Sequence, residues 1–229
     1  MKRFYTDATT RAGVDGLEVL LDGRPVKTPA KHPLLLPNQP LADAVAAEWQ
    51  AQGETIDPRT MPLTGLANAA IDRVAPEPSA FARSIALYGE SDLLCYRAEH
   101  PAELVQAQAD AWDPLLGWAR RRFDIDFEVV GGIVHRAQHP LTLERLSQAV
   151  AARDAFALAA LSQFVTLSGS LVIGLALAEG AVTADEAWTA ASVDERYQAA
   201  RWGEDAEAAR VQEARRADFL AAARFFSLL

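Results

Sequence analysis

The chain has 229 residues, of which 50% are hydrophobic and 23% are charged, so it has enough apolar material for a sizeable globular core. Its formal net charge of -9 argues against nucleic acid or anionic lipid as the main partner, because phosphate groups require a basic face. The longest apolar run, residues 171–178, is far shorter than the ~20 residues of a membrane span, so no membrane insertion is expected.

The cysteine content indicates the compartment. Cys95 is the only cysteine, so no disulfide can form within the chain and a reducing compartment is the default. The basic pair Lys2-Arg3 is not followed by an apolar run, and the pattern is therefore not that of a signal peptide. We expect a cytoplasmic protein.

The first part of the chain is predicted to be rich in β-strands. Residues 16–21 form a strand candidate, and Asp22-Gly23 after them is a strong hairpin signal, because both positions of the turn need positive φ. Residues 24–28 are the predicted return strand, in which Pro25 is typical of a sheet edge.

Helical spacing of apolar residues begins after these strands. It extends over residues 41–52 and again over 62–74, where Pro62 suits a first helical turn. The prolines at 76 and 78 then indicate a boundary. We therefore predict an α+β fold, with a β-rich N-terminal lobe over 1–76 and a mostly helical lobe over 77–229.

The second lobe contains several helical patterns. They cover residues 81–88, 104–119, 143–152, 155–167, 171–178 and 211–226. Pro114 is expected to kink or split the second of these segments. Residues 92–96 suggest an extended link, and residues 127–130 a short strand.

Two capping patterns occur between the last two of these patterns. Thr183 with Glu186 fits a capping box, and Ser192 with Glu195 fits the same pattern. Either one helix runs from Thr183 to Trp202 or two helices meet at Ser192. We favour the single helix.

Motifs for catalysis or cofactor binding are missing from the sequence. It has neither a Walker-type phosphate loop nor a glycine-rich dinucleotide fingerprint. His135 and His139 have helical ligand spacing but lie in a predicted loop without the glutamate of a metalloprotease helix. Cys95 lies in an apolar context that suggests an inert buried thiol. We expect no enzyme, no metal and no cofactor.

An aromatic stripe is the most prominent feature. Trp188, Glu195 and Trp202 are seven residues apart, so on one helix they would share a face. A wholly buried stripe would leave the glutamate unpaired in apolar surroundings, which is costly. Either Glu195 pairs at the rim with an arginine such as Arg201 or Arg210, or the stripe is partly open and a protein partner supplies the cation or amide.

The order and spacing of many short motifs resemble those of one family. The matching segments are RFY at 3–5, LDGRPVKTPA at 21–30, AEWQAQ at 47–52, MPLT at 61–64, LAN at 66–68, ID at 71–72, CYR at 95–97, WDP at 112–114, SLVI at 170–173, YQ at 197–198 and WG at 202–203. The family is the ATP-synthase assembly chaperones of mitochondria and α-proteobacteria, which bind the α subunit of the catalytic head.

This resemblance implies a role without catalysis, metal or nucleotide. It implies that a monomer holds the free α subunit until the β subunit displaces it, in the bacterial cytoplasm or, in eukaryotes, the mitochondrial matrix. The family has an important acidic residue just before the Tyr-Gln pair, and Glu195 or Asp194 matches that position. The expected partner-binding residues are Glu195, Asp194, Trp188 and Trp202.

Other matched residues are expected to be structural. Trp49 matches the tryptophan of the N-terminal helix, and Asp22, Gly23 and Pro25 belong to the hairpin motif. One departure is Arg196, which interrupts the acidic run of the family pattern. Two other functions stay open: a small-molecule-binding protein or enzyme with a pocket between the lobes, or a permanent structural subunit of a complex.

Overall fold

The computed structural model describes residues 1–203 and 205–229, which form two compact units. The first unit consists of Met1–Pro78, Asp154–Ala160 and Ala221–Leu229. The second consists of Ser79–Arg153 and Leu161–Leu220. The predicted boundary after residue 76 lies close to the end of the first of these segments, whereas no sequence signal indicated that two later segments join the N-terminal part.

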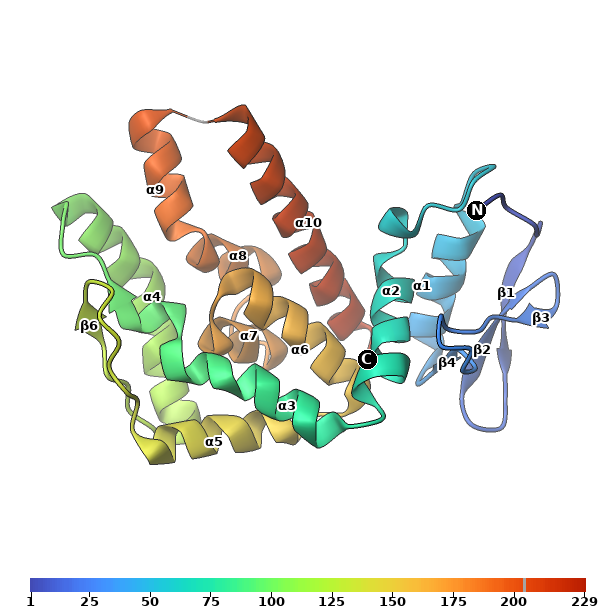
Figure 1. Cartoon of the computed structure of the whole chain (residues 1–229), viewed down its shortest axis with the longest axis horizontal. Coiled ribbons are helices and arrows are strands. Elements are labelled where there is room, and N and C mark those ends of the chain that lie inside the picture. Colours follow the sequence, from blue (N-terminus) through green and yellow to red (C-terminus); the bar gives the residue numbers. More distant parts are fainter. Residues whose placement is uncertain (204) are drawn as a thin grey trace. The chain divides into compact units, whose positions relative to one another are not determined.

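The first unit combines a small antiparallel sheet with helices (Figure 1). Its elements are β1 (Ala8–Ala12), β2 (Leu17–Leu21), β3 (Arg24–Pro25), β4 (Leu35–Leu36), α1 (Gln39–Gln50), a 3₁₀ helix (Pro58–Thr60), α2 (Pro62–Ala69) and a π-helical turn (Ala70–Val74). The central strand β2 pairs with β1 along its whole length, with β3 at one end and with β4 at the other. With the helices that follow, this sheet confirms the predicted α+β fold.

The predicted hairpin is present between β2 and β3. Asp22 and Gly23 have φ values of 48° and 78°, as a type I′ turn requires. The Asp22 carboxylate also accepts hydrogen bonds from the backbone N–H groups of Thr6 and Asp7. These bonds, the one from Asp7 first, lower the pKa of Asp22 and fasten the turn to the N-terminal segment.

Residues from the end of the chain complete the first unit. The side-chain oxygen of Asn38 caps α1 by accepting from the N–H of Leu41 at 3.0 Å. The amide nitrogen of the same side chain donates to the carbonyl of Leu228 at 2.7 Å. The rings of Phe156 and Phe225 stack with centroids 6.3 Å apart. The N-terminal unit therefore depends on residues beyond 220.

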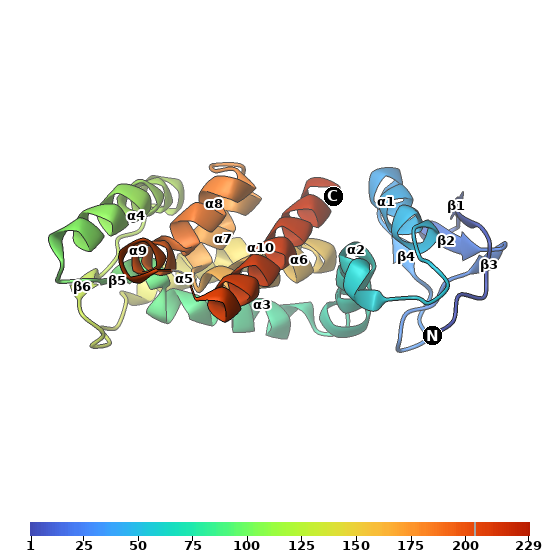
Figure 2. The same ribbon diagram turned by 90° about the horizontal axis from the view of Figure 1, so that it is seen from above.

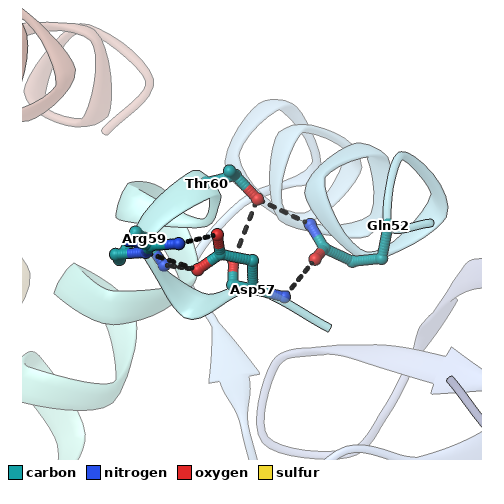
Figure 3. A network of polar contacts seen from close by, with 4 residues as sticks. All are labelled: Gln52, Asp57, Arg59 and Thr60. Carbon is teal, nitrogen blue, oxygen red and sulfur yellow. Dashed lines mark hydrogen bonds and ion pairs between the residues drawn. The ribbon is translucent and has the colours of Figure 1, made fainter. Parts of the chain in front are cut away.

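Gln52, just beyond the C-terminal end of α1, organises the loop that follows (Figure 3). The Gln52 side chain accepts from the N–H of Asp57 at 2.8 Å and donates to Oγ1 of Thr60 at 3.0 Å. Asp57 pairs with Arg59 at 2.7 Å, and this hydrogen-bonded pairing lowers the pKa of Asp57 to about 2. One turn earlier on α1, the carboxylate of Glu48 caps the start of α2.

The second unit is built mainly from helices. Its elements, some of which continue into the first unit, are α3 (Pro78–Ala86), 3₁₀ helices (Leu87–Ser91 and Leu93–Cys95), β5 (Tyr96–Arg97), α4 (Ala102–Phe123), β6 (Val130–Gly131), α5 (Pro140–Ala151), α6 (Ala155–Ser168), α7 (Leu171–Ala178), α8 (Ala184–Ala191), α9 (Val193–Trp202) and α10 (Ala206–Ser227). The apolar helix α7 is buried among α4, α6 and α8 (Figure 2). Among the residues described, no helix is both long and apolar enough to cross a membrane.

Three local predictions for the second unit were wrong or incomplete. The predicted extended link at 92–96 is mostly a 3₁₀ helix, because the Asp92 side chain accepts from the N–H of Leu94 and caps it. Pro114 does not split α4, since apolar burial of the neighbouring Trp112 and Leu115 outweighs one missing hydrogen bond. The strand predicted at 127–130 shrinks to Val130–Gly131, which pairs in parallel with β5.

Candidate functional site

The stretch that was predicted as one helix is broken at Ser192. Helix α8 ends at Ala191 and α9 begins at Val193. The hydroxyl of Ser192 donates to the carbonyl of Trp188 at 2.8 Å, so it closes the end of α8 and forms no capping box for α9. The capping box at Thr183, by contrast, is formed as predicted.

The two tryptophans of the stripe have different environments as a result. Trp188 on α8 is only 7% exposed, and its ring contacts that of Phe219 at a centroid distance of 5.4 Å. Trp202 at the end of α9 is 72% exposed. One tryptophan therefore belongs to the core and the other presents a large apolar surface to solvent.

A groove separates α9 from α10, and Trp188 lies among the residues that line it. Figure 1 shows α9, which leads away from α8, and the first half of α10 running in opposite directions. The groove encloses about 880 Å³. Its apolar lining includes Trp188, Ala199, Trp202, Ala208 and Val211. Val211 is 56% exposed, so the α10 wall also offers apolar surface.

Glu195 lines this groove without a charged partner. In residues 1–203 and 205–229 no arginine or lysine forms an ion pair with its carboxylate, so the predicted pairing with Arg201 or Arg210 is not found. The adjacent Asp194 is half-buried and accepts a hydrogen bond from Nε2 of Gln108 at 2.7 Å. Of the two acidic candidates, only Glu195 has an exposed carboxylate to offer to another molecule.

The arginines on the α10 side of the groove are already engaged. Arg215 donates to the carbonyl of Leu167 at 2.7 Å. Arg216 pairs with Asp185 at 3.0 Å and lies 3.8 Å from Glu213. An incoming molecule thus meets apolar side chains in the groove and, at Glu195, an uncompensated negative charge.

The family to which the chain belongs follows from comparison of its sequence with known families. A model of the ATP12 chaperone protein family matches residues 2–120, which is more than half of the chain. The chain belongs to the ATP12 chaperone family. It is thus a chaperone of ATP synthase assembly, as the order of its motifs had indicated.

Solved and curated proteins, among them two named Atp12, resemble the chain over most of its length. Atp12 from Paracoccus denitrificans is 44% identical, with a TM-score of 0.95 over 99% of this chain and 97% of that one. The Atu1473 protein of Agrobacterium tumefaciens is 41% identical, with a TM-score of 0.94 over 99% and 85%. The mitochondrial atp12 protein of Schizosaccharomyces pombe is 23% identical over 81% of this chain and 68% of its own.

The four residues of this ATP12 chaperone that were expected to be structural lie in the first unit. Trp49 contacts the ring of Tyr5 edge-on at 5.8 Å, and its carbonyl accepts from the Tyr5 hydroxyl at 2.6 Å. Asp22, Gly23 and Pro25 form the β2–β3 turn and its return strand. These contacts are internal to the unit and give the motifs a structural explanation.

The contribution of α10 to the groove did not follow from the sequence pattern. Val211 was assigned to the apolar stripe of a final helix, which suggested a core position. A signal was present, because Arg210, Gln212 and Glu213 flank Val211 and no other large apolar residue lies within five positions of it. An isolated apolar residue in such a segment is typical of an exposed contact as well as of a narrow core stripe.

Proposed function

We propose that this ATP12 chaperone binds the free α subunit of ATP synthase through the groove between α9 and α10. The observation that carries the proposal is Glu195, an exposed carboxylate without an ion-pair partner among the described residues, beside the apolar side chains of Trp202 and Val211. Protein interfaces concentrate their binding energy in patches of this kind, in which aromatic anchors are surrounded by a polar rim.

The physical purpose of such binding is protection. An α subunit without its β neighbours exposes apolar faces that are normally buried, and large exposed apolar patches promote aggregation. A chaperone must cover such a face firmly enough to protect it and still release it to β. Release to β depends on the difference between the affinity of α for β and its affinity for the chaperone. It requires no chemical step by the chaperone.

The oligomeric state and the compartment belong to the same proposal. We take the active form to be a monomer that captures α transiently, in the cytoplasm of a bacterium or in the mitochondrial matrix of a eukaryote. A permanent subunit would instead stay with the finished ATP synthase at fixed stoichiometry.

A capture experiment tests the proposal. The tagged chaperone is incubated with a lysate of its source, and the bound proteins are identified by mass spectrometry. We expect the α subunit without β, and release of α when purified β is added. Recovery of intact ATP synthase, or of no α subunit at all, would refute transient capture of α.

A further inference from the structure

We infer that the segment held in the groove is an amphipathic α-helix of the partner, with large apolar side chains on one face and a lysine or arginine beside them. This inference rests on the proposed function and specifies which part of the partner is recognised. It follows from the walls of the groove, from its apolar lining and from its charges.

The walls favour a helical occupant. Both are α-helices, α9 (Val193–Trp202) and α10 (Ala206–Ser227), whose interior backbone groups are bonded within each helix. An extended segment between them would find no strand edge, and its own N–H and C=O groups would lose water without gaining partners. A helix satisfies its own backbone and needs only side-chain contacts.

The lining suits the packing of a third helix. Trp188 supplies a buried aromatic contact, and the exposed Trp202 and Val211 flank it on the two walls. The small residues Ala199 on α9 and Ala208 on α10 line the same groove, and another helix can approach closely over such residues. The volume of about 880 Å³ is large enough for several apolar side chains and far larger than a single anchor needs.

The charges that line the groove indicate which polar residues the partner helix carries next to its apolar face. The carboxylates of Glu195 and Glu207 line the groove and form no ion pair among the described residues. Arg215 and Arg216 line it too, but both are engaged within the second unit. With Arg196, the described lining holds three arginines against the four carboxylates of Glu195, Asp205, Glu207 and Glu213, so its net charge is negative. A partner helix with a lysine or arginine next to its apolar face would neutralise it.

Cross-linking from defined positions tests the inference. A photoreactive benzophenone amino acid is placed at position 199 or 208, one on each wall, and purified α subunit is added. Position 214 is the matched control, because Ala214 is an exposed alanine on α10 that does not line the groove. We expect cross-links from 199 and 208 to one segment of α, at residues spaced by three or four. We expect none from 214.

The binding of α by the unmodified chaperone separates the helix-in-groove inference from the proposed function. If unmodified chaperone captures α but positions 199 and 208 give no cross-link, or link to a strand or loop, the helix-in-groove inference is wrong while the proposed function survives. If the unmodified chaperone captures no α, both fail. As a second readout, Trp202→Ala is expected to weaken α binding at least about tenfold. Unchanged binding would contradict the groove as the site.

Discussion

Gln108 on α4 and Asp194 on α9 are joined by a hydrogen bond of 2.7 Å that ties the first turn of α9 to α4. The side-chain oxygen of Gln108 accepts a hydrogen bond from the N–H of Ala98 at 2.8 Å. Gln108 is only 3% exposed, so this amide links three segments from within the second unit. Asp194 therefore has an internal structural contact, while its neighbour Glu195 has an exposed carboxylate.

This relationship predicts that Gln108→Ala lowers the stability of the protein. The substitution leaves the N–H of Ala98 and the Asp194 carboxylate without their partner, and an unsatisfied buried group costs about 1–3 kcal/mol. The free energy of unfolding in urea measures the effect. Gln106→Ala on the exposed side of α4 is the control and should change stability by at most about 0.5 kcal/mol. Equal effects of the two substitutions would contradict the structural role of Gln108.

Glu195→Lys should separate binding from folding. The change reverses a charge that has no internal ion-pair partner among the described residues, so circular dichroism and the melting temperature should stay unchanged. Binding of purified α subunit should weaken at least about tenfold because the partner's basic residue now meets a like charge. Asp218→Lys, an exposed reversal on α10 outside the groove, is the control. Normal α binding by the Glu195 variant would argue against a surface role for this residue.

Two helical glycines should respond in opposite directions to alanine. A Cβ atom at Gly174 on α7 would lie 2.7 Å from Cγ2 of Val165, so Gly174→Ala should destabilise the fold by about 1–3 kcal/mol through overpacking. A Cβ atom at Gly65 on α2 meets nothing within 4 Å. Gly65→Ala should therefore stabilise by about 0.5–1 kcal/mol, because alanine favours helix. Melting temperatures of both variants are the measurement, and shifts of the same sign would contradict the packing seen around α7.

Cys95 should make the protein less stable in alkali. Burial raises the pKa of its thiol from 9.0 to about 12. The folded chain thus keeps a proton that the unfolded chain loses as pH rises between these values, and stability falls by up to about 1.4 kcal/mol per pH unit in that window. The difference in unfolding free energy between the wild type and Cys95→Ala, followed against pH, isolates this contribution. A difference that does not change with pH would show that the thiol titrates normally.

The same burial predicts a slow reaction of the thiol with a disulfide reagent. Only the thiolate attacks such a reagent, and Cys95 is both 1% exposed and held in its protonated form. We expect a slow reaction in buffer near neutral pH and a fast one in urea. Equal rates would mean that the thiol is accessible in the folded protein.

Features with local causes could be predicted from the sequence. The Asp22-Gly23 turn depends on two adjacent residues that tolerate positive φ, and the structure confirms it. Helix α7 was predicted with its observed bounds, because Ser170 caps it and an apolar run fills it. The capping box at Thr183 has the same local origin.

Features that depend on distant residues could not be predicted in this way. The break at Ser192 is decided by burial of its hydroxyl, which then bonds to Trp188 instead of capping α9. The hydrogen bond that distinguishes Asp194 from Glu195 comes from Gln108, which is far away in the sequence. The groove itself requires α10 to lie beside α9 at a distance that the apolar pattern of neither helix specifies.

The contact between Asn38 and Leu228 has a consequence for biosynthesis. A ribosome releases the strands and α1 of the first unit early, but the carbonyl that Asn38 binds belongs to a residue made 190 positions later. The ring that stacks on Phe156 belongs to Phe225, which is also made near the end of synthesis. Until Phe225 and Leu228 emerge from the exit tunnel, the nascent N-terminal segment has no partner for these positions. These two contacts of the first unit can therefore form only late in synthesis, although its strands and α1 are translated first.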